Sequence, residues 1–214
     1  MLPQVMNVSE LIVGAASRDI CPQSPQFLFG YPHVERYSEG VKDPILSSAM
    51  YLRSDSGEAL FLANDIIFVD KAMTAEVRQK LSEAVGVARQ SVLVSATHTH
   101  SAPIVVEHVS NRNDPVVPKP DSAYREFLVD SMVQAGIEAV RGAVPATMSF
   151  DVARVDGVGT NRRTSTGPQD PEVPVMVGRD LDGQPIACML VYSMHPTVLH
   201  EDSRFISGDF PPYA

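Results

Sequence analysis

The chain has 214 residues, of which 44% are hydrophobic and 20% are charged. This composition is sufficient for one sizeable core and predicts one large domain over residues 1–214. The formal net charge is −9, with 26 acidic and 17 basic residues and no basic stripe, which argues against nucleic-acid binding through phosphate neutralisation.

The first third of the chain predicts a loop followed by a β-hairpin. Residues 30–44 are punctuated by Gly and Pro and predict an exposed loop. Two apolar runs at 46–53 and 58–68 flank a DSGE turn and predict the two strands of the hairpin. The second run is almost continuously apolar, which is typical of a central strand that is covered on both faces.

A helix and a further strand are expected next. Residues 70–85 predict an amphipathic helix that ends at Gly86. Its expected apolar face consists of Ala72, Ala75, Val77, Leu81 and Val85. The run at 91–97 predicts the next strand. Strand, helix and strand in this order predict a βαβ-type crossover.

The second half of the chain predicts a long loop, a second helix and further strands. The loop at 104–120 is rich in Pro, Asn and Asp, and loops of this length are often functional or mobile. Asp121 is the expected N-cap of a helix at 122–141. A strand at 146–155 and a hairpin around DLDGQP, with its second strand at 185–193, complete an α/β fold in which helices flank a mixed β-sheet.

We expect neither a transmembrane segment nor a signal peptide in this sequence. The longest apolar runs are broken, as at Asn64 and Asp65, and are too short to span a bilayer. The N-terminus lacks a basic region followed by a long apolar stretch. Cys21 and Cys188 lie far apart in sequence and are expected to be free thiols. We therefore expect a soluble, cytoplasmic protein.

Two histidines stand at the end of the strand expected at 91–97. His98 and His100 form an H-x-H pair, and side chains at i and i+2 of an extended chain point to the same face. Open α/β sheets place their ligands at the carboxyl ends of such strands. Neutral imidazole is a common zinc ligand, so the pair is a candidate metal or catalytic site.

His195 has a similar position at the end of the strand expected at 185–193. Pro196 follows it and disfavours a helix there. Histidines at two strand ends strengthen the hypothesis that they converge on one site.

Two acidic residues are candidates for supporting this site. Asp65 lies within a nearly apolar run, and a buried carboxylate needs a partner or a metal. It could accept a hydrogen bond from a ligating histidine, or it could occupy a capping or edge position. Asp209 follows Gly208 and could play the same part, or simply form an Asx-type turn.

Two adjacent cations stand in a Gly-rich loop, GTNRRTSTG. Arg162 or Arg163 could polarise a carbonyl or neutralise an oxyanion, and the alternative is a solvated loop cation. The sequence contains no G-x-S-x-G elbow, P-loop, G-x-G-x-x-G or C-x-x-C motif.

Six motifs together resemble the N-terminal catalytic region of the neutral/alkaline non-lysosomal ceramidases. In chain order they are VGAASRDICP, GVKDPILSSAMYL, VSATHTHSAP, GTNRR, DPEVPVMVGRDLDGQPIACMLVYSMHPTVL and SGDFPPYA. The resemblance runs through nearly all of the chain. It implies a zinc-dependent amidase that cleaves the N-acyl bond of ceramide, or of a similar lipid-like substrate, to give a sphingoid base and a fatty acid.

The resemblance also implies roles for individual residues. His98 and His195 would be zinc ligands. His100 would lie beside the metal and contact the substrate or the developing oxyanion. Arg162 would help to hold the substrate head group or the tetrahedral intermediate.

The family's remaining zinc ligands, a glutamate and a tyrosine, lie beyond the segment that matches SGDFPPYA. We therefore expect an incomplete catalytic domain. Two alternatives stay open, namely a metal-dependent esterase or other carbonyl hydrolase, and a catalytically silent ligand-binding module with a vestigial metal site.

Overall fold

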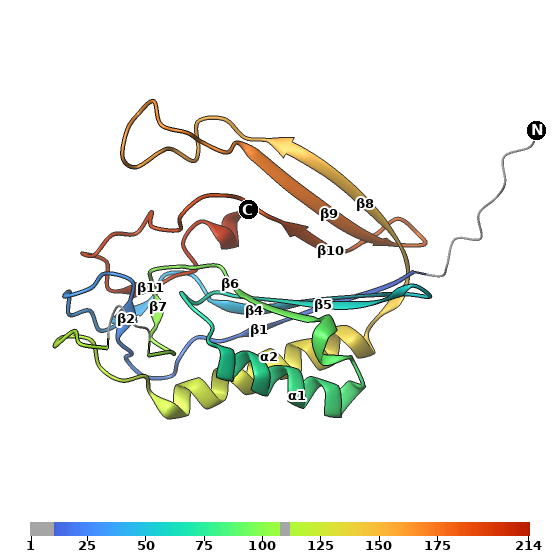
Figure 1. Cartoon of the computed structure of the whole chain (residues 1–214), viewed down its shortest axis with the longest axis horizontal. Helices are drawn as coiled ribbons and strands as arrows, with labels where there is room; N and C mark the ends of the chain where they lie inside the picture. Colours follow the sequence, from blue (N-terminus) through green and yellow to red (C-terminus); the bar gives the residue numbers. More distant parts are fainter. Residues whose placement is uncertain (1–10, 108–111) are drawn as a thin grey trace, which may run out of the picture.

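The computed structural model describes residues 11–107 and 112–214 and has an α/β fold (Figure 1). Its main sheet has seven strands in the order β10-β9-β8-β1-β4-β5-β6. These strands are β1 (Ile12–Asp19), β4 (Leu46–Ser54), β5 (Gly57–Asn64), β6 (Val92–Ala96), β8 (Val144–Arg154), β9 (Glu172–Asp180) and β10 (Pro185–Leu190). The helices are α1 (Lys71–Val85) and α2 (Ser122–Arg141). The sheet is mixed, because only β5 and β6 pair in parallel.

Short elements complete the described chain. They are β2 (Leu28–Phe29), β3 (Gly40–Val41), β7 (Ala102–Pro103), β11 (Phe205–Ile206) and the 3₁₀ turns η1 (Arg89–Ser91) and η2 (Pro211–Tyr213). No helix in the described ranges is both long and apolar enough to cross a bilayer.

The main sheet folds over itself, so that the molecule has three layers. Helices α1 and α2 cover one face of β1, β4 and β5, and the strands β8, β9 and β10 arch over the other face (Figure 1). The junction is narrow, since β1 and β8 are joined by only two residue pairs, Ile12 with Pro145 and Val13 with Val144. A small core that includes Val13, Met50 and Met176 fills the space between the two strand layers.

The predicted βαβ crossover is confirmed, with α1 connecting the parallel strands β5 and β6. Asp70 caps α1 by accepting a hydrogen bond from the backbone N–H of Met73 at 2.6 Å. Gly86 ends the helix with a φ of 76°, a conformation that favours glycine. The predicted apolar face was partly wrong, because the buried side chains are Met73, Val77 and Leu81, whereas Ala72 and Ala75 are exposed.

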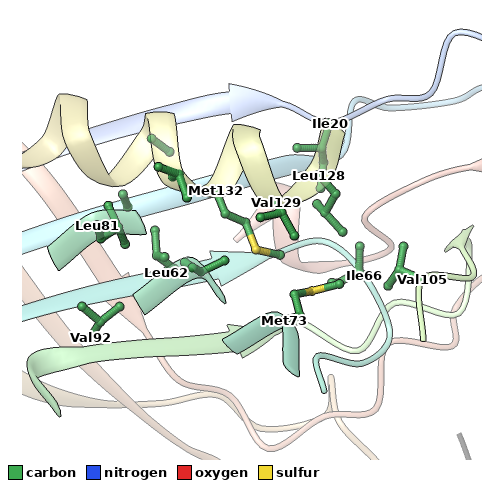
Figure 2. Packing of buried hydrophobic residues seen from close by; sticks show 14 of the residues in the cluster. Ile20, Leu62, Ile66, Met73, Leu81, Val92, Val105, Leu128, Val129 and Met132 are labelled. Carbon is green, nitrogen blue, oxygen red and sulfur yellow. The ribbon is translucent and has the colours of Figure 1, made fainter. Parts of the chain in front are cut away.

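The predicted second helix is also confirmed, and it supplies most of the main core. Asp121 accepts hydrogen bonds from the backbone N–H groups of Ala123 and Tyr124. Figure 2 shows Leu128, Val129 and Met132 of α2 packed against Leu62 of β5 and Met73 of α1. Each of these side chains is fully buried, so truncating one to alanine is expected to cost about 2–5 kcal/mol of stability.

The strands β5 and β6 end earlier than the apolar runs predicted, and they end side by side. β5 stops at Asn64, where the N–H of Ile66 turns back to the Asn64 carbonyl at 2.8 Å. β6 stops at Ala96, and the N–H of His98 then donates to the carbonyl of Ile66 at 3.0 Å. The two segments that leave the sheet therefore stay in contact, and they position the first half of the candidate site.

Candidate metal centre

Three histidines from two layers of the fold converge on one point. His98 and His100 follow β6, and His195 follows β10. One ring nitrogen of each lies within 4.8 Å of the corresponding nitrogen of the other two. The ring centroids are 4.7–5.1 Å apart. Three imidazoles at this spacing form a candidate metal site, and the described residues contain no other such cluster.

The backbone around His98 directs its ring. His98 has a φ of 71°, in the left-handed region, so the chain turns sharply here and does not continue as a strand. Its Nδ1 lies 2.8 Å from the carbonyl oxygen of Ile67. A carbonyl only accepts, so Nδ1 carries the proton and Nε2 presents its lone pair. A backbone carbonyl behind a ring in this way is a common arrangement for a metal-ligating histidine.

His100 is buried, with 8% of its surface exposed, and its Nε2 lies 2.8 Å from Nε2 of His195. Burial, together with the neighbouring His195 and His98 rings, lowers the pKa of His100 to about 4. Gly30 packs directly against this ring. A Cβ at Gly30 would lie 2.5 Å from Cγ of His100, so only glycine fits at this position.

His195 lies between His100 and Arg162. The guanidinium of Arg162 is 3.3 Å from Nδ1 of His195 and can only donate. Nδ1 therefore accepts, and the proton of His195 stands on Nε2, from which it is donated to His100. Burial, the His98 ring and the Arg162 cation lower the pKa of His195. Both rings are thus neutral near pH 7, the state in which imidazole binds a metal.

The donor set fits zinc with one adjustment. Neutral imidazoles suit Zn²⁺, and His98 already presents a free Nε2 lone pair. A metal bound at Nε2 of His195 would move the ring proton to Nδ1, where it would face the Arg162 guanidinium. Zinc binding at this atom therefore requires Arg162 to withdraw from His195.

The carboxylates proposed to support the site lie beside it. Asp65 is buried and accepts from the N–H of Leu46 at 2.9 Å and from Oγ1 of Thr97 at 3.1 Å. Burial raises the pKa of Asp65. In the described ranges its carboxylate makes no hydrogen bond to the ring of His98, which the Ile67 carbonyl holds instead. Asp65 thus anchors the residue before His98, and a role behind the metal stays a prediction.

Asp209 similarly anchors the segment that follows His195. It has a φ of 64°, and its carboxylate accepts from the backbone N–H groups of Leu199 and Phe210, both at 2.9 Å. This is turn chemistry of the kind the sequence allowed as an alternative. A hydrogen bond from a ligating histidine to Asp209 stays a prediction.

Arg162 and His195 line a cavity of about 470 Å³ that is open to solvent. The loop of Asn161 shapes its wall, because the Asn161 side-chain oxygen accepts from the N–H groups of Arg163 and Thr164. The cavity brings a cation and a candidate metal ligand to one surface. Arg163 also lines it, without a hydrogen bond to His195 in the described part of the chain.

The sequence patterns did not reveal Tyr31 and Arg36, which contact the histidine segments. The loop at 30–44 was predicted to be exposed, but Arg36 is 1% exposed. Arginine is rarely buried to this degree, and nothing in the local Gly/Pro pattern indicated its partners. Those partners are backbone carbonyls, which have no signature in a sequence.

Comparisons with known proteins agree on one family. The family model for neutral/alkaline non-lysosomal ceramidase, N-terminal, matches residues 11–214. Neutral ceramidases A and B of Dictyostelium discoideum are 23% and 22% identical to the chain, covering 94% of it and 31% and 30% of their own lengths.

Solved structures show the same fold. The crystal structure of neutral ceramidase from Pseudomonas aeruginosa matches with a TM-score of 0.83 at 19% identity, covering 94% of this chain and 34% of that one. A ceramidase complexed with C2 matches with a TM-score of 0.82 at 18% identity, covering 94% and 33%. The chain thus spans about a third of the length of the relatives it matches.

Proposed function

Because the chain belongs to the neutral/alkaline non-lysosomal ceramidase family, we propose that it supplies part of a zinc-dependent site that hydrolyses the N-acyl amide bond of a ceramide-like lipid. The observation that carries this proposal is the convergence of His98, His100 and His195 within 4.8 Å. The products would be a sphingoid base and a fatty acid.

Two of the three histidines would hold the metal. His98 presents an Nε2 lone pair because its Nδ1–H is fixed on the Ile67 carbonyl. His195 would be the second ligand, from the other strand layer. A bound zinc ion polarises a carbonyl and lowers the pKa of a bound water to about 7.

His100 and Arg162 would act on the substrate. His100 is neutral near pH 7, since burial lowers its pKa to about 4, so its unprotonated Nε2 can accept a proton. Arg162 lines the open cavity next to His195, and its guanidinium is suited to stabilise negative charge on the former carbonyl oxygen. An Arg162 guanidinium released from His195 would be free to contact a substrate in this cavity.

Metal binding is the first test. Zinc is titrated into the metal-free full chain by calorimetry, and His98→Ala is compared with His33→Ala. The His33 side chain is 76% exposed and lies outside the cluster, so it is the matched control. Loss of a residue that only hydrogen-bonds to a metal ligand typically weakens metal binding by roughly 10–100-fold. We expect His98→Ala, which removes a ligand itself, to weaken zinc binding by more than this. Absence of zinc binding to the wild-type chain would contradict the proposal.

Substrate class is the second test. An N-acyl sphingoid amide and an ester of the same acyl chain are incubated with the zinc-loaded chain. Cleavage of the amide that is lost in His195→Ala supports the proposal. Cleavage of the ester alone would favour the esterase alternative, and cleavage of neither would favour the silent module.

A further inference from the structure

Arg36 is a fully buried cation that binds backbone instead of carboxylate. It lies between β2 and β3, is 1% exposed, and forms no ion pair with any described residue. Its guanidinium donates to the carbonyls of His100, of His200 at 3.2 Å and of Ser203 at 3.0 Å. Burying a charge is costly, so these three bonds must be worth more than a simple surface contact.

Tyr31 extends the same set of contacts. Its hydroxyl donates to the carbonyl of Leu199 at 2.8 Å. Its ring meets the His100 ring edge-on, with centroids 5.2 Å apart. The Arg36 guanidinium lies over the Tyr31 ring, 4.8 Å from the ring centroid. Tyr31 therefore contacts both a candidate metal-site ring and the cation that holds the backbone of that residue.

The two side chains join the two halves of the histidine cluster. One half is the His98–His100 segment after β6. The other is the segment 195–203, which begins with His195 and supplies three of the four carbonyls that Tyr31 and Arg36 bind. The fourth is the carbonyl of His100 itself.

We propose that Arg36 and Tyr31 are positioning residues that hold the His100 ring beside His195 at the candidate metal centre. The effect of this positioning on metal binding rests on the function proposed above, whereas its effect on the orientation of the His100 and His195 rings does not. Lysine cannot replace Arg36, because the planar fork of arginine reaches several carbonyls at once and an ammonium does not.

The first experiment uses the metal-free full chain. Imidazole ring resonances are recorded by ¹H–¹⁵N multiple-bond NMR for wild type, Tyr31→Phe, Arg36→Lys and Tyr124→Phe. Tyr124→Phe is the matched control, because its hydroxyl also donates to a buried backbone carbonyl at 2.8 Å, that of Ile20, away from the cluster. Tyr31→Phe is mild enough to test the proposal if Arg36→Lys does not fold.

We expect Tyr31→Phe and Arg36→Lys to shift the ring resonances of His100 and His195, and Tyr124→Phe to leave them in place. If the ring spectra of Tyr31→Phe and Arg36→Lys match that of Tyr124→Phe, the proposal is overturned. A purely structural role would lower the stability of all three variants without shifting the rings of His100 and His195.

The second experiment measures cobalt(II) binding through its visible absorption. We expect Arg36→Lys to bind about 10–100-fold more weakly than wild type, with an altered band that reports a changed ligand arrangement. Equal affinity and an unchanged band would overturn the positioning role in metal binding. Shifted rings in a wild-type chain that binds no cobalt would instead contradict the proposed function and leave the positioning of the rings supported.

Discussion

The Nε2 atoms of His100 and His195 lie 2.8 Å apart, joined by a hydrogen bond between two layers of the fold. Two nitrogens that share a tetrahedral zinc ion at about 2.1 Å are separated by roughly 3.4 Å. The pair is therefore slightly too close to be two ligands of one ion as it stands. A small opening of this contact, with the withdrawal of Arg162, would prepare His195 for the metal.

Arg162→Met should separate metal affinity from catalysis. Without the cation, the Nδ1 atom of His195 no longer accepts from Arg162 and is free to take the ring proton, and a nearby positive charge no longer repels the metal, so zinc should bind several-fold more tightly. Hydrolysis of an N-acyl amide should nevertheless slow by about 10²–10³-fold, because a donor to the oxyanion is lost. Calorimetry and kcat measure the two effects.

Arg163→Met is the matched control for this change, since the neighbouring cation lines the same cavity without bonding His195 in the described ranges. Equal effects of the two substitutions on zinc affinity would contradict the assigned role of the Arg162–His195 contact.

The metal-free chain should lose stability in mild acid because of its histidine cluster. The pKa of His100 is about 4 in the folded chain, against about 6.5 for an unfolded histidine, so the unfolded state binds more protons between these values. The free energy of unfolding should therefore fall as the pH drops from about 6.5 to about 4. The lowered pKa of His195 acts in the same direction.

Urea unfolding at a series of pH values, without metal, measures this effect. His100→Gln cannot be protonated and should show a shallower loss of stability than wild type across this pH window. Parallel curves for the two proteins would count against a buried, neutral His100.

Gly30→Ala should damage the site more than an otherwise similar substitution. Gly30 and Gly57 have φ values of 143° and 148°, so alanine is strained at both. Only at Gly30 does the new Cβ meet a side chain, 2.5 Å from Cγ of His100, whereas nothing lies within 4 Å at Gly57. Gly30→Ala should be less stable than Gly57→Ala by roughly 1–3 kcal/mol.

Chemical denaturation of the two alanine variants gives this difference, and cobalt titration shows whether the His100 ring has moved. Equal stabilities would mean that the His100 ring yields to the added methyl group without cost.

The two cysteines should react at different rates. Cys188 is exposed, and Cys21 is only partly exposed. Burial, with the neighbouring Asp19, raises the pKa of Cys21 to about 11, which leaves little thiolate at mildly alkaline pH. A thiol reagent should therefore label Cys188 quickly and Cys21 only on unfolding. In Cys188→Ser the fast phase should disappear; its persistence would show that Cys21 is accessible.

Local patterns predicted the regular elements well because their causes are local. Asp70 and Gly86 delimit α1, and Asp121 caps α2, through bonds to residues a few positions away. The parallel pairing of β5 and β6 follows from the strand–helix–strand order. Ala72 and Ala75 are exposed, contrary to the prediction. The elements that pack against α1 lie elsewhere in the chain, and they determine which of its side chains are buried.

The histidines of the candidate site could be predicted from the sequence, but the backbone groups that hold the site in place could not. Histidines after two apolar strands indicated a common site, and the structure brings His98, His100 and His195 together. The acceptor behind His98 is the carbonyl of Ile67, a group that every residue carries and no pattern distinguishes. The burial of Arg36 depends in the same way on carbonyls more than 60 positions away in the sequence.

The narrow β1–β8 junction has a consequence for folding order. His100 and His195 are 95 positions apart and belong to different strand layers, so the cluster exists only after the β8–β10 layer has docked. Closing a loop of this length is slow compared with forming the local hairpins and helices. During refolding, the capacity to bind a metal should therefore appear after most helical signal has returned, which makes it a reporter of the last assembly step.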